Sequence, residues 1–281
     1  MLKRIYLEIT NRCNLACSFC HQTAREARSL TPEEFEFLTD RLRGKTDLLF
    51  LHLMGEPLLH PDLADFIRSA AEKGFRPAVT TNGTLLRSEG AKLLDTPLNR
   101  VSISLHAPEA NPAFSDPDWL NEALTFGEKA DRKGIYVAYR LWNRGGLEEN
   151  NPGILQKLHR AYPGEWRKTR NGAQLTERTY LELADEFTWP DLSAPEHEGA
   201  LFCYALREQI GILCDGSVVP CCLDADGNMV LGNLFVSPLE EILRSERARR
   251  MYDAFTAHRA EEALCRHCGY AAVKKHRARE D

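Results

Sequence analysis

The sequence predicts an α/β protein: a partial (β/α)6 TIM-like barrel followed by a small α+β domain made of a β-hairpin and a helix. Apolar strand-like runs alternate with helical patterns over the first ~190 residues, and this alternation predicts a parallel sheet with right-handed crossovers. About six strand–helix units fit into that length, whereas a complete eight-unit barrel typically takes about 250 residues. The remaining sequence has hairpin turns instead. We therefore expect a barrel domain over residues 1–195 and a second domain over 196–281.

The expected strands are spaced so that a helix fits between each pair, and helix start and stop signals mark those helices. The first helix should begin at Thr31-Pro32-Glu33-Glu34, a capping box with proline at the first helical position, and end at Gly44. Further helical patterns end at Gly74 and before Gly134. The expected strands are Lys3–Thr10, Leu48–Met54, Ala78–Asn82, Arg100–His106, Ile135–Trp142 and a weaker run at Glu177–Leu183.

Several of these strands carry polar residues at alternate positions. Parallel strands that are buried on both faces normally form near-continuous apolar runs. For any single polar residue, a hydrogen-bonded place in the core is an equally good interpretation. Recurrence on at least four strands favours a polar barrel interior, to which Glu8, His52, Ser104, His106 and Arg140 would contribute.

Composition excludes several classes of protein. The 281-residue chain is 43% hydrophobic and 27% charged, with a net charge of −5, which argues against a protein that wraps nucleic acid. No apolar run approaches the ~18–20 residues that span a bilayer. The N-terminal MLKRIYLEIT lacks the pattern of a signal peptide, so we expect a cytoplasmic protein. Nine cysteines in such a chain indicate metal binding or redox chemistry rather than disulfides.

The cysteines fall into two groups. Cys13, Cys17 and Cys20 lie in the loop after the first expected strand, and no cysteine follows until Cys203. Three closely spaced thiolates can hold one iron–sulfur cluster and leave one iron open to another molecule. A zinc site usually takes four protein ligands, or three of different type and spacing.

At this loop the sequence resembles the radical S-adenosylmethionine (SAM) enzymes. Their signature is C-x3-C-x2-C with an aromatic residue before the last cysteine, and Phe19 supplies that residue here. The family has a partial (β/α)6 barrel with this loop after its first strand. The resemblance implies that Cys13, Cys17 and Cys20 hold a [4Fe–4S] cluster whose open iron binds SAM.

Further motifs of the family match in order along the chain. Met54-Gly55-Glu56-Pro57 is similar to a G-G-E-P segment that holds the SAM amino group, with Met54 in place of the first glycine. Asn82 belongs to Thr80-Thr81-Asn82-Gly83 at the end of the third strand. Ser104 and Arg140 resemble the groups that hold the SAM carboxylate and ribose, although a structural barrel role is an equal alternative. The cofactor-binding residues implied by the resemblance are Phe19, Gly55, Glu56, Asn82, Ser104 and Arg140.

The resemblance also implies the chemistry. One electron cleaves SAM to methionine and a 5′-deoxyadenosyl radical, which abstracts a hydrogen atom from the substrate. The protein positions the substrate and excludes water, while the cofactor carries out the difficult step. Substrate-facing candidates are His52, Glu8, His106 and Arg140.

The second cysteine group surrounds a predicted hairpin whose turn is Asp215-Gly216. A helix is expected to start at the capping box Ser237-Pro238-Leu239-Glu240 and run to about Phe255, and the charged tail from Lys274 should be solvated. Two cysteines at the hairpin and a C-x2-C pair form a four-thiolate framework that suits zinc or an iron–sulfur cluster equally. The framework consists of Cys203, Cys221, Cys265 and Cys268.

In this setting the framework resembles the short auxiliary-cluster domain of the radical SAM family, the "twitch" type related to the longer SPASM domain. That resemblance implies one auxiliary [4Fe–4S] cluster without an open iron, with zinc as the less favoured occupant. Cys214 and Cys222 are left unassigned. Small buried residues are the simplest interpretation of them, and a catalytic thiol or an alternative cluster ligand is the other.

The substrate is the least determined feature. The first hypothesis is hydrogen abstraction from a small polar substrate (a sugar, aminocyclitol or nucleoside derivative), with the auxiliary cluster accepting an electron. The alternatives are a peptide-modifying maturase and a radical lyase in queuine-type nucleoside salvage. A non-enzymatic iron–sulfur or zinc regulator is a further alternative. The expected electron donor is a flavodoxin or ferredoxin, in an anaerobic or well-reduced cell.

Overall fold

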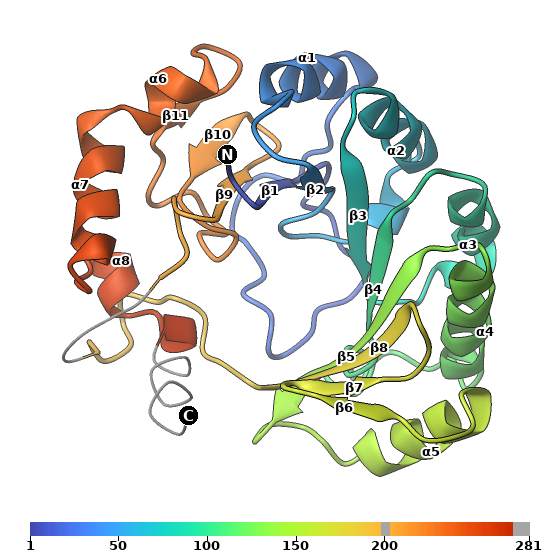
Figure 1. The fold of residues 1–281 in the computed structure, drawn as a ribbon. Coiled ribbons are helices and arrows are strands. Elements are labelled where there is room, and N and C mark those ends of the chain that lie inside the picture. The colour runs from blue at the N-terminus through green and yellow to red at the C-terminus, as the bar shows by residue number, and fades with distance from the viewer. Residues whose placement is uncertain (198–202, 272–281) are drawn as a thin grey trace. The chain divides into compact units, whose positions relative to one another are not determined.

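The computed structural model describes residues 1–197 and 203–271 (Figure 1). The charged tail predicted from Lys274 onward lies outside these residues. The chain forms two compact units: unit 1 comprises Met1–Asn11, Cys20–Gly55 and Phe187–Asp281, and unit 2 comprises Arg12–Phe19 and Glu56–Glu186. This division differs from the domains expected from the sequence, whose boundary at 195/196 stays a prediction.

Unit 1 joins the N-terminal strands to the C-terminal hairpin. Strand β1 (Arg4–Leu7) pairs in parallel with β2 (Leu48–Phe50) on one side and with β9 (Gln209–Ile212) on the other. Strands β10 (Ser217–Val219) and β11 (Gly232–Asn233) continue from β9 in antiparallel order. The predicted Asp215-Gly216 turn joins β9 to β10, and Gly216 adopts the left-handed φ of +81° that favours glycine there.

The helices of unit 1 confirm one capping prediction and correct another. Helix α1 (Pro32–Leu42) begins at Thr31 with both hydrogen bonds of the predicted capping box. The single helix expected from Ser237 to about Phe255 is wrong: α6 (Leu239–Leu243) and α7 (Glu246–Thr256) are separate helices. Pro238, not Ser237, is the N-cap of α6, and its side chain cannot cap, whereas Ser245 accepts a hydrogen bond from the Ala248 N–H and starts α7. Helix α8 spans Ala263–Arg266.

Unit 2 contains the remaining parallel strands, in the order β3 (Arg76–Thr81), β4 (Arg100–Ser104), β5 (Tyr136–Arg144) and β8 (Thr179–Asp185). A hairpin of β6 (Arg167–Thr169) and β7 (Gly172–Gln174) pairs antiparallel beside β8. This hairpin was not predicted from the sequence, because its strands are short and polar. The helical segments of this unit are η1 (Pro57–Leu59), α2 (Leu63–Glu72), α3 (Leu86–Leu94), α4 (Trp119–Arg132) and α5 (Asn151–Ala161).

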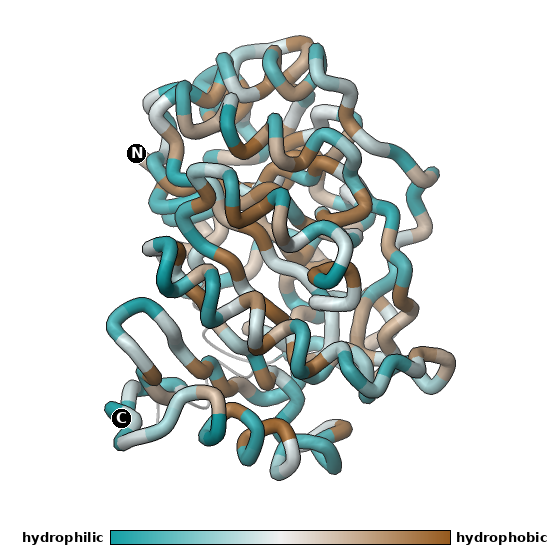
Figure 2. The backbone as a smooth tube through the Cα atoms, turned by 90° about the vertical axis from the view of Figure 1, so that its right-hand side faces the viewer, coloured by the Kyte–Doolittle hydropathy of each residue, from teal (hydrophilic) through white to brown (hydrophobic). Residues whose placement is uncertain are grey.

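The core of unit 2 lies between its sheet and its helices. Val79, Val101 and Ile103 are fully or almost fully buried in the strands, and α3 and α4 run side by side along the sheet (Figure 1). Figure 2 shows hydrophobic and hydrophilic residues interspersed along the backbone. In α2 the buried residues Leu63, Phe66, Ile67 and Ala70 recur at the spacing of an amphipathic helix. The parallel sheet core with helical crossovers confirms the predicted α/β class.

Candidate functional site

The loop that carries the first three cysteines follows β1. Cys13 and Cys17 belong to unit 2, and Cys20 begins the next stretch of unit 1. Three residues along the chain span at most about 11 Å, so Cys20 stays within reach of Cys17 whatever the loop conformation. Cys17 is buried, Cys20 is half-buried and Cys13 is exposed. Burial raises the pKa of Cys20 although backbone N–H groups of Gln22 and His21 hydrogen-bond its sulfur.

Two asparagine side chains donate toward the cysteine sulfurs of unit 2. The Asn111 Nδ2 lies 2.9 Å from the Cys17 Sγ, and its Oδ1 accepts from the Ala16 N–H at 2.7 Å. The Asn82 Nδ2 lies 4.0 Å from the Cys13 Sγ and donates to the Asn14 Oδ1 at 2.9 Å. Soft thiolates with amide donors directed at them suit an iron–sulfur cluster, so the residues fit the implied group.

Asn82 was predicted from the sequence as a site residue, whereas Asn111 was not. Asn111 lies 94 residues from Cys17 in a loop after β4, where asparagine ordinarily indicates a turn. No local pattern could have distinguished it.

Glu56 is a buried carboxylate that links the start of η1 to the end of β3. Its Oε1 accepts from the Leu58 N–H at 3.0 Å, which caps η1, and its Oε2 accepts from the Asn82 N–H at 2.7 Å. Burial raises the pKa of Glu56 to about 7, against the lowering effect of these hydrogen bonds and of Thr81. Gly55, just before it, has the left-handed φ of +77°. A buried carboxyl of this kind would ionise readily beside an ammonium group.

Arg140 lies at the centre of a polar network on the parallel strands of unit 2. Its Nε is 3.2 Å from the Glu182 Oε2, its Nη1 donates to the Thr80 Oγ1 at 3.1 Å, and its guanidinium lies 4.3 Å from the Trp142 ring centre. Arg100 also contacts Glu182. Burial opposes ionisation of Glu182, but Arg140 and Arg100 outweigh it and hold the pKa of that carboxyl below its usual value.

Two other predicted site residues of unit 2 lie near Arg140 in the sheet. Ser104 is its register partner on β4. The His106 Nδ1 lies 3.1 Å from the Arg140 carbonyl oxygen, and the His106 ring packs against Phe19 with centroids 4.8 Å apart. Burial lowers the pKa of His106 to about 4, so it is neutral at pH 7. The structure therefore brings Phe19, Ser104, His106 and Arg140 into one neighbourhood.

Glu8 and His52 belong to unit 1. Glu8 is fully buried on the strand end, where it pairs with Arg25 at 2.6 Å and accepts from the Met54 N–H at 3.2 Å and the Cys214 N–H at 3.1 Å. The His52 ring meets the rings of Phe50 and Tyr6 edge-on. Glu8 thus holds three segments of unit 1 together, and its predicted contact with a substrate stays a prediction, as does that of His52.

The second cysteine site lies within unit 1. Burial raises the pKa of Cys221 well above its ordinary value, and the charges of Cys203, Cys222 and Cys265 raise it further. Burial also raises the pKa of Cys265, and the charges of Cys203 and Cys268 raise it further. The four predicted ligands therefore interact with one another. They are half-buried, and thiolates that repel each other in such a site are stabilised by a positively charged metal centre. Among the described residues, no three potential ligands are arranged to bind a single metal ion.

The two unassigned cysteines differ. Cys214 is fully buried, and its pKa is raised by burial and by Glu8. Burial raises the pKa of Cys222 to about 11, against the lowering effect of a hydrogen bond with Tyr6. Cys222 thus lies near the second cysteine site, whereas Cys214 lies beside Glu8.

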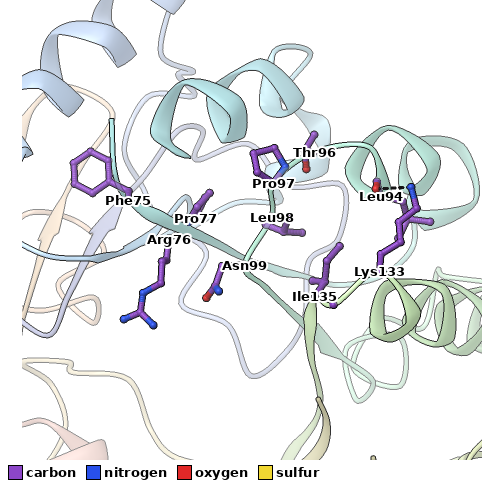
Figure 3. A pocket seen from close by; sticks show the side chains of 11 residues that line it. Phe75, Arg76, Pro77, Leu94, Thr96, Pro97, Leu98, Asn99, Lys133 and Ile135 are labelled. Atoms are coloured by element: carbon purple, nitrogen blue, oxygen red, sulfur yellow. Dashed lines mark hydrogen bonds between the residues drawn. The ribbon is translucent and has the colours of Figure 1, made fainter. Parts of the chain in front are cut away.

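A cavity of about 490 Å³ lies at the other end of the strands of unit 2 (Figure 3). It is lined by residues just before β3, β4 and β5, including Phe75, Asn99 and Ile135. Lys133 reaches the Leu94 carbonyl oxygen there at 2.9 Å and pairs with Asp95 at 2.8 Å. In barrels of parallel strands this end contributes stability, and ligands bind at the carboxyl ends.

Comparisons with known proteins agree with the cysteine sites. Residues 7–137 match the family model described as the radical SAM superfamily, and residues 203–269 match the SPASM model, described as an iron–sulfur cluster-binding domain. Fold and site thus define an iron–sulfur enzyme. The chain matches a radical SAM enzyme with a C-terminal SPASM/twitch-like cluster domain. The two domains indicate a SAM-binding [4Fe–4S] cluster and an auxiliary iron–sulfur cluster.

Among curated relatives, a probable GTP 3′,8-cyclase of Pyrobaculum aerophilum is 33% identical over 161 residues, 56% of this chain and 47% of the relative. The Fe-coproporphyrin III synthase of Methanosarcina barkeri is 34% identical over 138 residues, 47% of this chain and 35% of the relative. The chain thus spans about half or less of the length of these relatives.

Among solved structures, BtrN in complex with AdoMet and 2-DOIA aligns with a TM-score of 0.65 at 17% identity, covering 98% of this chain and 95% of that one. Streptococcus suis SuiB aligns with a TM-score of 0.63 at 15% identity, covering 97% and 72%. At these identities the likeness establishes the fold. In the described part of the chain, no helix is both long and apolar enough to cross a membrane.

Proposed function

We propose that this enzyme reductively cleaves SAM and abstracts hydrogen from a small polar substrate, such as a sugar, aminocyclitol or nucleoside derivative, as an oxidoreductase. The observation that carries the proposal is the Arg140–Glu182 pair beside Thr80. A hydroxyl group both accepts and donates hydrogen bonds. The guanidinium can donate to the oxygen of a substrate hydroxyl, and the carboxylate can accept its hydrogen. Arg140 is the register partner of Ser104, the last residue of β4, so the pair lies toward the carboxyl ends of the parallel strands, where α/β barrels build their sites.

The residues of the first cysteine loop have distinct roles in this proposal. Cys13, Cys17 and Cys20 would hold the SAM-binding cluster, and Asn111 and Asn82 donate toward the first two sulfurs. When bound, the clusters and SAM supply a hydrogen-abstracting radical and a place for the electron that leaves the substrate. Glu56 would hold the SAM ammonium, and the neutral His106 ring against Phe19 would exclude water from the site.

Cys203, Cys221, Cys265 and Cys268 would hold the auxiliary cluster. Their mutual interactions in a half-buried part of unit 1 support this assignment, with Cys222 as a neighbour outside the ligand set. We infer that the enzyme works in the cytoplasm of a well-reduced cell with a flavodoxin or ferredoxin as electron donor, because iron–sulfur clusters of this kind are sensitive to oxygen.

Two alternatives follow from the relatives. Identity to proteins named GTP 3′,8-cyclase favours a nucleotide or nucleoside substrate, which the same Arg–Glu pair could bind. The fold is also similar to that of SuiB, whose structure has been solved with a precursor peptide, so a peptide is the second alternative substrate.

The test is anaerobic reconstitution followed by reduction with SAM. We expect 5′-deoxyadenosine from the wild type and none from Cys17→Ala, which should keep the absorbance of the second cluster. A panel of aminocyclitols, nucleosides, GTP and peptides then identifies the class whose product forms in step with 5′-deoxyadenosine. A wild type that holds clusters but never cleaves SAM would instead be an iron–sulfur regulatory protein.

A further inference from the structure

The segment that follows Cys20 is hydrogen-bonded to the turn that follows Cys221 and Cys222. The Asp226 Oδ2 lies 2.5 Å from the His21 Nε2, and its Oδ1 accepts from the Thr23 Oγ1 at 2.5 Å and from the Ala24 N–H at 3.0 Å. Asp226 comes shortly after Cys221 and Cys222 in the chain. One carboxylate therefore binds three of the four residues that follow Cys20. All of these contacts lie within unit 1.

A second set of hydrogen bonds, made by Arg25, holds the same segment. The Arg25 Nε donates to the Ala225 carbonyl at 2.7 Å, and its Nη2 pairs with the buried Glu8 at 2.6 Å. The Thr23 hydroxyl also reaches the Ala225 carbonyl at 3.2 Å. The Arg25 side chain is only 16% exposed, so this pair is shielded from solvent. Asp226 and Arg25 together fix the chain from residue 21 to residue 25.

The segment held by these contacts, residues 21–25, contains a strained residue. Gln22 has a φ of +50°, in the left-handed region that residues with a side chain seldom adopt. Strain of this kind persists only where surrounding contacts impose it. Here the contacts are those of His21 and Thr23, which flank Gln22 and both bind Asp226.

The strained turn directs donors at a predicted cluster ligand. The backbone N–H groups of His21 and Gln22 hydrogen-bond the sulfur of Cys20. Hydrogen bonds to cluster sulfurs are one of the determinants of reduction potential, because they stabilise the more negative reduced state. The geometry of His21 and Gln22 is therefore a property of the first cysteine site, although Asp226, which imposes it, belongs to the second domain.

We propose that Asp226 is a positioning residue of the SAM-binding cluster: by holding His21 and Thr23 it keeps Gln22 in the left-handed turn that aims two N–H groups at Cys20. The auxiliary-cluster domain thereby sets the retention and potential of the first cluster. The hydrogen bonds of Thr23, His21 and Ala24 outweigh the effect of burial and hold the pKa of Asp226 below its usual value, so the anchor is ionised. The inference rests on the proposed function in taking Cys20 as a ligand.

The test uses the full chain, reconstituted anaerobically, with Asp226→Asn as the main variant. We expect a lower midpoint potential for the SAM-responsive electron paramagnetic resonance signal and about 10-fold faster release of iron to a chelator, as for other residues that orient metal ligands. The matched control is Asp253→Asn, an exposed acid on α7, which should behave as the wild type.

Rescue separates positioning from general instability. Glycine adopts a positive φ without strain, so Gln22→Gly should restore much of the lost potential and iron retention in the Asp226→Asn background. Should Asp226→Asn fail to fold, Thr23→Val removes one of the same hydrogen bonds in an isosteric side chain, and a smaller change in the same direction is expected.

Asp226→Asn with wild-type potential and iron release would overturn the proposal, and so would a double variant that recovers nothing. These outcomes differ from the result expected if the proposed function itself is wrong. In that case the wild type shows no SAM-responsive signal, and iron release still reports whether Asp226 holds the first site.

Discussion

The side-chain amide of Asn111 donates to the sulfur of Cys17 over 2.9 Å, while its own oxygen accepts from the backbone N–H of Ala16. One asparagine thus fixes the cysteine loop of unit 2 and faces a predicted cluster ligand. It does so from a loop beyond β4, and it is buried. A donor held in this way should affect the electronic properties of the cluster as well as its retention.

Asn111→Asp tests that effect. Aspartate keeps the oxygen that accepts from Ala16 but replaces the donor with a carboxylate oxygen next to the sulfur. We expect the midpoint potential of the SAM-binding cluster to fall by about 60 mV, the shift that corresponds to a tenfold change in a one-electron equilibrium. The measurement is a redox titration followed by electron paramagnetic resonance. Asn121→Asp, an exposed change on α4, is the control.

SAM binding should depend on the ionisation of Glu56. Burial raises the pKa of Glu56 to about 7, and the SAM ammonium favours its ionised form. Affinity should therefore rise with pH up to about 7 and then level off, being about 10-fold weaker at pH 6 than on the plateau. Equilibrium binding of SAM between pH 6 and 8 measures this. Glu56→Gln should bind weakly at every pH, and an equally steep slope in that variant would refute the assignment.

The same shift has a defined sign for stability. The pKa of Glu56 is higher in the folded than in the unfolded chain, so between about 4.5 and about 7 the unfolded chain releases the proton first. The contribution of Glu56 to the free energy of unfolding consequently falls as pH rises through that window.

Arg140→Lys should weaken substrate binding without removing SAM cleavage. Lysine keeps the positive charge but cannot donate to Glu182 and Thr80 in the fixed directions of a guanidinium. We expect the KM for the substrate to rise about 10-fold or more, the cost of one charged hydrogen bond. Arg144→Lys, at the more exposed end of the same strand, is the matched control. If Arg140→Lys instead lost SAM cleavage and kept the wild-type KM for the substrate, Arg140 would act on the cofactor.

The second cysteine site predicts an iron count. Two four-iron clusters give about eight irons per chain, and Cys265→Ala should reduce that number to about four. Cys214→Ala is the control, because Cys214 is buried beside Glu8, and its iron content should not change. About four irons and one zinc in the wild type would show that zinc occupies the second site.

The Glu8–Arg25 pair should matter for stability. Removing one partner of a buried ion pair typically costs about 3–5 kcal/mol, so Glu8→Gln should lower the thermal midpoint by roughly 10 °C. The surface pair Lys3–Glu208 provides the comparison: Glu208→Gln should cost less than about 1 kcal/mol. Unchanged stability with lost activity would support the predicted substrate-facing role of Glu8.

Much of the fold could be predicted because its signals are local. Six apolar runs became the parallel strands, and the Thr31 capping box and the Asp215-Gly216 turn lie where their residue types require. The Ser237 box matched the same pattern and was wrong, because Pro238 took the cap position. The polar β6–β7 hairpin had no hydrophobic pattern to reveal it.

The site was predictable where a motif concentrates residues in one loop and not where the fold brings distant residues together. Cys13, Cys17 and Cys20 lie close together in the sequence, but Asn111 and Asp226 reach the cysteine loop from far along the chain. Gln22 gave no signal either, since glycine is the residue that usually indicates a positive φ.

The pairing of β1 with β9 has a consequence for biogenesis. Lys3 and its partner Glu208 are 205 residues apart, so at 5–20 residues per second the ribosome needs about 10–40 s to supply the strand that covers the edge of β1. During that time this edge of the nascent chain has no native partner and can pair with another chain. Slow release of the C-terminal segment would therefore extend the exposure to aggregation, and iron delivered before β9 emerges would meet a cysteine loop whose anchoring turn does not yet exist.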